Sequence, residues 1–359
     1  MRTDRDNKEP TGRRILFLPV ADERGASTRH RVLAHRAALE QAGFITRVRF
    51  PLTFARPSFT RRTWRVLDLA RDLYSPVRSD LLFIHRKMYP PSLAPRMRRK
   101  AKRIFFDMDD ALDLPPPGKG SGDRHNERYH RNFIATLNMV DLALCANREL
   151  AARLPHKRFE LLPTPIDTTR FAPGAVSPGE GPVLGWVGYS DNLHYLESLT
   201  EPLLEVAKRH AGLRLIVVAD RPPRMPGINL EFRRWTLETE LSCFAGIRVG
   251  LMPLIDSPWA RGKSAFKAIQ YMALGIPAVA SPVGMNREVI RDGGNGFLPA
   301  DARAWVEVLD RLLSDPNLRA SIGREGRKTV ERDYSLNVVS RRLVEILKNA
   351  PPFFQRGSE

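Results

Sequence analysis

The chain is poor in cysteine and has no long apolar run. Its 359 residues include only two cysteines, Cys145 and Cys243, each inside an apolar stretch. Two isolated thiols do not make a disulfide framework or a zinc site, and they favour a reducing cytosol. No run of about 18 apolar residues is present, which excludes a predicted membrane-spanning helix. The polar residues 1–14 lack the apolar core of a secretory signal, so we expect a cytoplasmic protein.

Several catalytic and cofactor patterns are also missing. The glycines after the first predicted strand do not form Gly-x-Gly-x-x-Gly, which argues against a nicotinamide cofactor. No Ser–His–Asp or Cys–His arrangement of a nucleophilic enzyme stands out. Zinc-finger and RNA-binding motifs are absent, so nucleic-acid binding would depend on charge alone.

Positive charge is abundant and uneven. The formal net charge is +18, and residues 1–110 alone hold 25 Lys or Arg against 12 Asp or Glu. Such a surface favours anionic partners, namely phospholipid headgroups, nucleic acid or acidic saccharides. An arginine-rich surface without a specific anion is the alternative. The prominent arginines are Arg61, Arg62, Arg65, Arg96, Arg98 and Arg99.

Short apolar runs alternate with helical patterns along the chain. The first series predicts strands at 14–19, 44–50, 81–84, 103–107 and 140–146, with a loop at 21–28, a helix at 29–42 and a loop at 115–122. After a Pro- and Gly-rich stretch, the second series predicts strands at 183–187, 213–219, 228–232, 249–252, 278–281 and 296–298. This alternation predicts an α/β protein with two doubly wound parallel sheets, whose ligands bind at the carboxyl ends of the strands.

The strongest functional pattern is a lysine-containing stretch before the strand predicted at 278–281. It predicts a helix that begins near Ser264 and ends at Gly275, because Gly is favoured just past a helix end. Lys263, Lys267 and Gln270 are spaced to share one face of this helix. The N-terminus of a helix attracts phosphate, so these side chains indicate a phosphate site. A solvated basic face is the alternative.

The same region resembles a known family. From 263 to 298 the chain contains, in order, Gln-Tyr-Met-Ala, Gly-Ile-Pro, Ala-Ser, Glu-Val and Gly-Asn-Gly-Phe, and it resembles the donor-binding segment of retaining glycosyltransferases of family 4. The run at 183–188 resembles the first strand of that family's C-terminal domain. The stretch 162–167, with Phe171 and Pro173, resembles its interdomain linker.

This resemblance implies the GT-B fold, in which two Rossmann-like domains face each other across a cleft. It implies an acceptor-side domain at 1–170, a nucleotide-sugar-binding domain at 171–333, and a segment at 334–359 with a helix that crosses back and a tail. It also implies transfer of a sugar from a nucleotide diphosphate donor, with retention of configuration and without a metal or a further cofactor.

The resemblance implies a set of donor-binding residues, two of which differ from the residues that the family has at these positions. The expected donor-binding residues are Gly188, Tyr189, Trp235, Gly262, Ser264 and Gln270. Gly262 and Gln270 stand where the family has glutamates, so Gln270 would bind the ribose diol without a charge. The sugar would then be held by backbone groups of the turn 262–264. The family's basic residues after the first strand are missing, and we expect Lys263 and Lys267 to bind the diphosphate instead.

The acceptor-side residues come from the first series of strands. Gly25, Ala26 and Ser27 offer backbone N–H groups, and Arg29 can clamp an anion. His85 follows a strand and is expected to contact sugar or acceptor, with a structural role as the alternative. The cluster Asp107, Asp109 and Asp110 suggests a metal, but we favour a hydrogen-bonded turn for Asp107. Asp109 and Asp110 would bind an acceptor hydroxyl or orient an arginine.

The sequence leaves three functions open. The favoured one is a glycosyltransferase whose catalytic groups are Lys263, Lys267 and His85 and whose partners are a nucleotide sugar and a saccharide or lipid-linked acceptor. Its charge favours peripheral attachment to the inner face of an anionic membrane, although a soluble acceptor would require no membrane. The second is a GT-B binding or scaffold protein that has lost catalysis, because of Gly262 and Gln270. The third is a nucleic-acid or polyanion binder, because of the positive charge. Under the favoured function, nucleic acid is not an expected partner.

Overall fold

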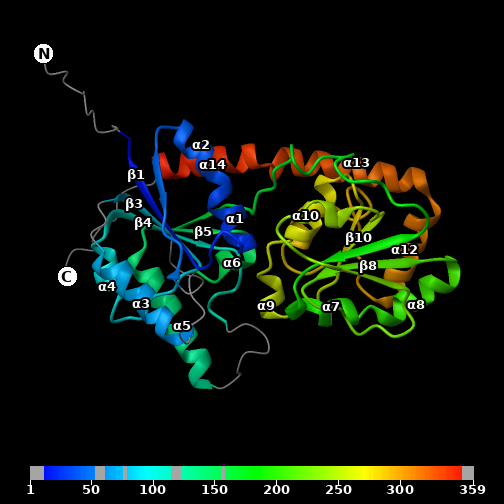
Figure 1. Cartoon of the computed structure of the whole chain (residues 1–359), viewed down its shortest axis with the longest axis horizontal. Helices are drawn as coiled ribbons and strands as arrows, with labels where there is room; N and C mark the ends of the chain where they lie inside the picture. Colours follow the sequence, from blue (N-terminus) through cyan, green and yellow to red (C-terminus); the bar gives the residue numbers. More distant parts are fainter. Residues whose placement is uncertain (1–11, 53–60, 76–78, 115–122, 155–157, 350–359) are drawn as a thin grey trace, which may run out of the picture. The chain divides into compact units, whose positions relative to one another are not determined.

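The structure is a computed structural model of the whole chain that describes residues 12–52, 61–75, 79–114, 123–154 and 158–349 (Figure 1). The side chains of residues 61, 62, 65 and 123–125 are outside this description. The loop expected at 115–122, the tail beyond 349 and the side chains of Arg61, Arg62 and Arg65 therefore lie outside the described part.

The chain divides into two compact units. Unit 1 comprises residues 1–146, 150–162 and 340–359, and unit 2 comprises residues 147–149 and 163–339. These divisions differ from the expected boundaries at 170 and 333. The linker belongs to unit 2 because Ile166 is wholly buried in its core and forms a parallel bridge with Ser335.

Unit 1 is built on a parallel sheet with strand order β2-β1-β3-β4-β5-β6. The strands are β1 (Arg14–Pro19), β2 (Ile45–Val48), β3 (Ser79–His85), β4 (Ala101–Met108), β5 (Leu142–Cys145) and β6 (Phe159–Leu161). The inner strands are apolar and buried along most of their length, as expected for a parallel sheet covered on both faces. The five strands predicted from the apolar runs are present, whereas β6 was not predicted.

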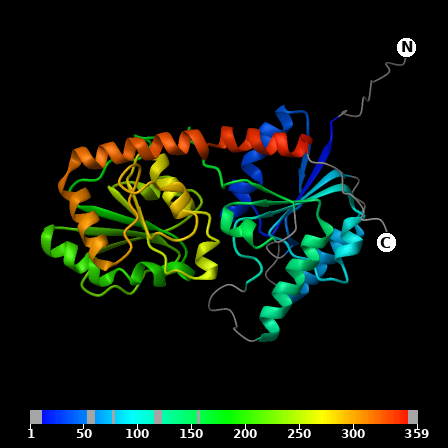
Figure 2. The ribbon, with the colours of Figure 1, turned by 180° about the vertical axis from the view of Figure 1, so that it is seen from behind.

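Helices cover both faces of this sheet (Figures 1 and 2). They are α1 (Ala26–Arg31), η1 (Leu33–His35), α2 (Arg36–Gln41), α3 (Arg61–Tyr74), α4 (Ala94–Arg98), α5 (Asp123–Met139), α6 (Arg148–Ala152) and the later part of α14 (Leu336–Asn349). The expected continuous helix at 29–42 is wrong. The helical region begins at Ala26 and is interrupted at Val32, whose φ of −121° and ψ of −63° are not helical.

Unit 2 contains a parallel sheet with strand order β11-β10-β7-β8-β9. Its strands are β7 (Val183–Val187), β8 (Arg214–Ala219), β9 (Leu230–Arg234), β10 (Val249–Met252) and β11 (Ala278–Ala280). The strand expected at 296–298 is wrong, because Phe297 forms only an isolated bridge with Val279.

Alternate residues of β7 face two hydrophobic clusters on opposite sides of the unit 2 sheet. Val183 and Val187 contact the cluster that contains α10 (Phe266–Ala273), whereas Leu184 and Trp186 contact the other cluster. The remaining helices are η3 (Ser190–Asn192), α7 (Leu193–Glu197), α8 (Thr200–Arg209), η4 (Ser242–Phe244), α9 (Pro258–Arg261), α11 (Asn286–Val289), α12 (Ala302–Ser314) and α13 (Pro316–Asp333). Among the described helices of the chain, none has the length and apolar composition to cross a bilayer.

Candidate donor-binding site

The lysine-containing stretch begins its helix later than predicted. Ala265 adopts a left-handed conformation with φ of 51°, and α10 starts only at Phe266. Lys263 therefore precedes the helix, and the prediction that it shares a helical face with Lys267 and Gln270 is wrong. Lys267 and Gln270 do lie on α10, where the Nζ of Lys267 donates to the Oε1 of Gln270 at 3.2 Å.

The end of α10 agrees with the prediction. Gly275 has φ of 72°, and the N–H of Ile276 donates to the carbonyl of Tyr271 at 2.9 Å, which closes the last turn. Tyr271 also fastens the helix to the sheet, because its hydroxyl accepts from the N–H of Val187 at 3.0 Å. A Cβ on Gly250 would lie 2.2 Å from the Tyr271 ring. The residue at this position of β10 must therefore lack a side chain so that α10 can pack against the strand.

Lys263 is positioned by the segment that follows β7. Its Nζ donates to the Oδ1 of Asn192 at 3.0 Å and lies 5.8 Å from the centroid of the Tyr195 ring. Sequence reasoning identified this segment only as the place where the family's basic residues are missing. It did not identify Asn192 or Tyr195 as partners of Lys263. Their position shortly after the end of a predicted strand was the only feature of the sequence that could have indicated a role at the site.

The turn between α9 and α10 uses part of its backbone internally. The N–H groups of Gly262 and Lys263 donate to the carbonyls of Trp259 and Ala260, each at 3.1 Å. These two amides therefore do not supply the free backbone donors expected for the sugar. Ser264 is partly buried beside the N-terminus of α10, which has no side-chain cap.

The ends of β7 and β9 bring two aromatic rings together. The centroids of Tyr189 and Trp235 are 6.0 Å apart and their rings are tilted by 50°. Tyr189 is 46% exposed, so its ring is open to a ligand. Gly188 precedes it, and a Cβ there would lie 2.3 Å from the buried ring of Trp186. Packing therefore requires glycine at this position, independently of any ligand.

A carboxylate missed by sequence reasoning lies beside these rings. Asp220, after β8, accepts hydrogen bonds from the amide and the hydroxyl of Ser190, each at 2.7 Å. Burial alone would raise the pKa of Asp220, but the hydrogen bonds from Ser190 lower it below its usual value. The ends of β7, β8 and β9 thus present two aromatic rings and an ionised carboxylate.

In unit 1, His85 belongs to a buried ionic group at the ends of β3 and β4. Its Nδ1 lies 2.7 Å from the Oδ2 of Asp107, and the guanidinium of Arg31 binds both oxygens of that carboxylate, at 2.8 and 2.5 Å. Burial opposes ionisation of Asp107, but Arg31 prevails and lowers its pKa to about 2. His85 is 0% exposed, which fits the structural alternative.

Asp109 and Asp110 both form ion pairs with the guanidinium of Arg86. The guanidinium of Arg86 lies 3.3 Å from an Asp109 oxygen and 2.7 Å from an Asp110 oxygen. The backbone of Arg86 is in the left-handed region, with φ of 58°. The arrangement matches the alternative that these carboxylates orient an arginine. Within the described residues, no group of three acidic, His or Cys side chains is placed to hold a metal ion.

Gly25, Ala26 and Ser27 lie at the start of α1, not in the loop expected at 21–28. Gly25 is the N-cap residue, and its N–H donates to the carbonyl of Asp22 at 3.1 Å. Arg29 donates from Nη1 to the carbonyl of Arg24 at 2.6 Å. For Arg29 to bind an anion as predicted, its hydrogen bond to the carbonyl of Arg24 would have to break.

The segment that contains the predicted donor residues matches a known family. Residues 181–315 match the model of the glycosyl transferases group 1. The chain is therefore similar to that family over this segment. The group 1 segment runs from just before β7 to just past the end of α12, and it includes both lysines, Gln270 and the two aromatic rings.

Relatives and solved structures extend this likeness. Over 230 residues, the chain is 24% identical to a D-inositol 3-phosphate glycosyltransferase of Corynebacterium urealyticum, covering 56% of this chain and 54% of the relative. The chain thus spans about half the length of the curated relatives it matches. Sucrose-phosphate synthase from Thermosynechococcus elongatus aligns with a TM-score of 0.68 at 15% identity, over 94% of this chain and 98% of that one.

HepE from Anabaena, solved in complex with UDP and glucose, aligns with a TM-score of 0.65 at 14% identity, over 94% of this chain and 99% of HepE. These similarities confirm the fold class. Both units are doubly wound parallel α/β units, and together they have the GT-B fold.

Proposed function

We propose that this chain is a glycosyltransferase that moves a sugar from a nucleotide diphosphate donor to a saccharide or lipid-linked acceptor with retention. We place it in a subset with the donor motif Lys-x-x-x-Lys-x-x-Gln-Tyr-Met-Ala. The observation that carries the proposal is the position of Lys263 and Lys267. They flank the uncapped N-terminus of α10 within the group 1 segment.

Catalysis would consist of donor positioning and stabilisation of the leaving diphosphate. Lys263, held by Asn192, and Lys267, held by Gln270, bring two positive charges to a helix end that itself carries a partial positive charge. Charge that develops on the departing diphosphate is stabilised by such preorganised groups. Tyr189 and Trp235 would contact the nucleotide base, and Gln270 the ribose.

His85 would act from the acceptor side through Asp107 and Arg31. Because the imidazole is wholly buried, this role requires a local opening when the acceptor binds. Gly25, Ala26, Ser27 and Arg29 would approach the acceptor or a phosphate, as would the pair Asp109 and Asp110 once displaced from Arg86. We further propose that the basic unit 1 attaches peripherally to the cytoplasmic face of an anionic membrane.

A screen of nucleotide sugars by thermal stabilisation tests the proposal. HepE was solved with UDP-glucose, and a Corynebacterium glutamicum relative is a GDP-mannose-dependent mannosyltransferase, so uridine and guanosine donors both belong in the screen. A ligand at 100 times its dissociation constant stabilises by about 2.7 kcal/mol. No stabilisation by any nucleotide sugar or nucleoside diphosphate would contradict the proposal.

A second candidate is a GT-B protein that binds a nucleotide sugar without transferring it. It is favoured by the glycine at 262 and by Gln270, whose side chain is 3% exposed and already bonded to Lys267. Slow hydrolysis of the donor distinguishes the two candidates. A transferase releases free sugar and nucleoside diphosphate in the absence of acceptor, whereas a binding protein leaves the donor intact.

A further inference from the structure

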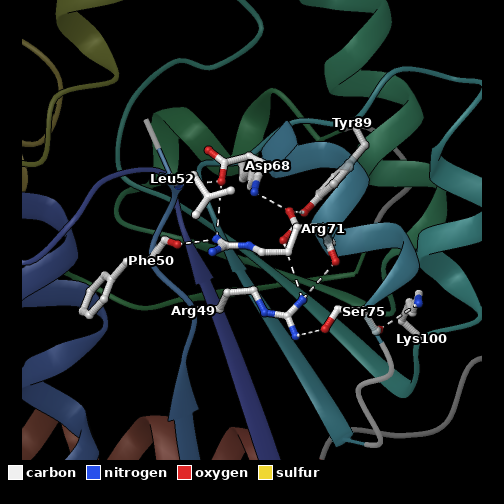
Figure 3. Close-up of polar contacts among 10 residues, drawn as sticks. Arg49, Phe50, Leu52, Asp68, Arg71, Ser75, Tyr89 and Lys100 are labelled. Carbon is white, nitrogen blue, oxygen red and sulfur yellow. Dashed lines mark hydrogen bonds and ion pairs between the residues drawn. The ribbon is translucent and has the colours of Figure 1, made fainter. Parts of the chain in front are cut away.

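Helix α3 turns charged side chains inward. Asp68, drawn in Figure 3, and Asp72 are each 3% exposed, and both accept hydrogen bonds from neighbouring segments. Asp68 accepts from the N–H of Leu52 at 2.5 Å. Asp72 accepts from the hydroxyl of Tyr89 at 2.9 Å and forms an ion pair with Lys87. The inner side of α3 is therefore held by these polar contacts as well as by the buried side chain of Leu73.

Two arginines complete this network. Arg71 donates to the carbonyl of Phe50, and Arg49 donates to the hydroxyl of Ser75 at 3.1 Å (Figure 3). Arg49 also lies 3.9 Å from the carboxylate of Asp72. The partners of α3 in this network lie in the segments that follow β2 and β3, all within unit 1. The network therefore anchors α3 to these two segments.

The outer side of α3 is apolar. Val66 is 60% exposed, Leu67 is 44% exposed and Tyr74 is 73% exposed. Thr63 and Ala70 lie between them on the same side of the helix. A surface helix usually turns its apolar stripe toward the core, whereas α3 leaves these three apolar side chains exposed in addition to burying Leu73. Contiguous exposed apolar residues on such a helix mark a surface that contacts another apolar phase.

A pocket lies beside this helix. It occupies about 740 Å³ between α4 and α5, and α4 also packs against α3. The pocket is lined by the apolar side chains of Ala94, Ile134, Ala135 and Met139. Ile134 is 39% exposed although it lines an apolar cavity. The volume is in the range of about 300–1,000 Å³ that suits a ligand, and the lining suits an aliphatic chain.

The edge of the pocket is strongly basic. Residues 94–103 contain six Lys or Arg and no Asp or Glu. Arg96 and Arg99 are exposed, whereas Arg98 lines the pocket and pairs with Asp141 at 3.2 Å. From α5, Arg131 also lines the pocket and is exposed. An aliphatic pocket with a cationic edge complements a lipid that has an anionic headgroup.

We propose that the outer side of α3 and the pocket between α4 and α5 form a docking site for an anionic phospholipid bilayer. Val66, Leu67 and Tyr74 enter the interfacial layer, an acyl chain occupies the pocket, and Arg96, Arg99 and Arg131 contact headgroup phosphates. Amphipathic helices with basic flanks bind membranes in this way. The inference rests on the proposed function, because it names the elements through which unit 1 attaches. Nucleic acid offers no aliphatic chain for this pocket, so lipid is favoured.

Cosedimentation with vesicles tests the docking site. The probe is vesicles of phosphatidylglycerol and phosphatidylcholine, with pure phosphatidylcholine as the uncharged comparison. We expect binding to the anionic vesicles at low salt, and a decrease of at least tenfold in the double variant Leu67→Glu/Tyr74→Glu. The variant Arg96→Glu/Arg99→Glu should also bind at least tenfold more weakly, because each basic group contributes about 1 kcal/mol near an anionic surface. The matched control is Val338→Glu, since Val338 is 37% exposed on another helix.

Site-specific labelling tests the pocket itself. The native Cys145 and Cys243 are buried, so a cysteine introduced by Ile134→Cys or Tyr74→Cys can be labelled selectively with a polarity-sensitive fluorophore. Both labels should shift to the blue on anionic vesicles. Lipid with a nitroxide on its acyl chain should quench them, and a label at Val338→Cys should not respond. A label at Ile134→Cys that stays in water while the protein binds vesicles would overturn the proposal.

Two further measurements distinguish membrane docking from misfolding and from dimer formation. Binding of a nucleoside diphosphate, measured by calorimetry, should be unchanged in the α3 and α4 variants, so that lost vesicle binding reports neither misfolding nor loss of the donor site. If the wild type binds vesicles but no nucleotide, the proposed function fails and the docking site stands. If Leu67→Glu/Tyr74→Glu converts a dimer to a monomer in light scattering and leaves vesicle binding unchanged, the face binds a second copy and the proposal is wrong.

Discussion

The ammonium group of Lys263 lies 3.0 Å from the Oδ1 of Asn192, a residue 71 positions earlier in the chain. An ammonium held by a neutral amide keeps its full charge, so the contact orients Lys263 without neutralising it. Lys267 is held in the same way by the neutral amide of Gln270. Each cation of the proposed diphosphate site thus has a neutral amide among its partners, and neither of these two contacts removes positive charge from the site.

Replacement of these lysines should weaken diphosphate binding. A charge-assisted hydrogen bond contributes about 1.5–3 kcal/mol, so Lys263→Ala and Lys267→Ala should each lower the affinity for a nucleoside diphosphate by about tenfold or more. Calorimetry measures the effect, and Lys208→Ala is the matched control, because the Lys208 side chain on α8 is 74% exposed. Unchanged affinity in a folded double variant would remove both residues from the site. Asn192→Ala should have a smaller effect, because the ammonium remains but loses its orientation.

Gln270 should discriminate between a whole nucleotide and its diphosphate part. If its amide binds the ribose diol, Gln270→Ala weakens binding of a nucleoside diphosphate and leaves pyrophosphate nearly unchanged. The side chain is 3% exposed and accepts from Lys267, so a purely structural role is the alternative. Equal weakening of both ligands, compared by calorimetry, would show that Gln270 only supports Lys267.

Donor turnover should persist when divalent metals are removed. Two lysines and a helix N-terminus supply positive charge at the proposed diphosphate site, where a metal would otherwise stabilise the leaving group. To measure this turnover, the donor is incubated with the protein in excess chelator, and its hydrolysis is monitored through the nucleoside diphosphate that is released. Activity that is abolished by chelator and restored by magnesium or manganese would instead return Asp107, Asp109 and Asp110 to consideration as metal ligands.

Local patterns predicted the strands and one helix end, whereas distant contacts decided the site. Apolar runs placed every strand of both sheets except β6, although they also predicted a strand at 296–298 that does not form. Gly275 placed the end of α10, because such signals act within a few residues. The start of α10 was missed because an alanine rarely adopts the left-handed conformation of Ala265, and nothing in its neighbours indicates it.

The ionic partners could not be found from local sequence. Arg31 and Asp107 are 76 residues apart and meet only because α1 packs near the end of β4. Asp109 and Asp110 look like metal ligands in sequence, and only the fold shows that Arg86 lies between them. The inward carboxylates of α3 are likewise explained by Lys87 and Tyr89, which come from the segment after β3.

His35 should make the protein less stable in mild acid. Its imidazole is buried, with Nδ1 2.8 Å from the hydroxyl of Ser340, and burial together with the charge of Arg31 lowers its pKa to about 3. In the unfolded chain, a histidine titrates near pH 6.5, so between pH 6.5 and 3 the unfolded state binds the extra proton. The stability contributed by neutral His35 is therefore complete above pH 6.5 and is lost as the pH falls toward 3.

Denaturant unfolding at pH 7.5, 6, 5 and 4.5 measures this loss. Each unit of separation between the two pKa values corresponds to about 1.4 kcal/mol, so the loss by pH 4.5 should reach a few kcal/mol. Asp107, with a pKa lowered to about 2, also loses its contribution in acid, but only below its ordinary value of 3.8. The window from pH 6.5 to 4.5 therefore lies above the range in which the contribution of Asp107 changes. His35→Gln should lower stability at pH 7.5 and flatten the dependence across this window, whereas His130→Gln, an exposed histidine on α5, should leave the slope unchanged. An equal slope in wild type and His35→Gln would show that His35 is not the group that titrates.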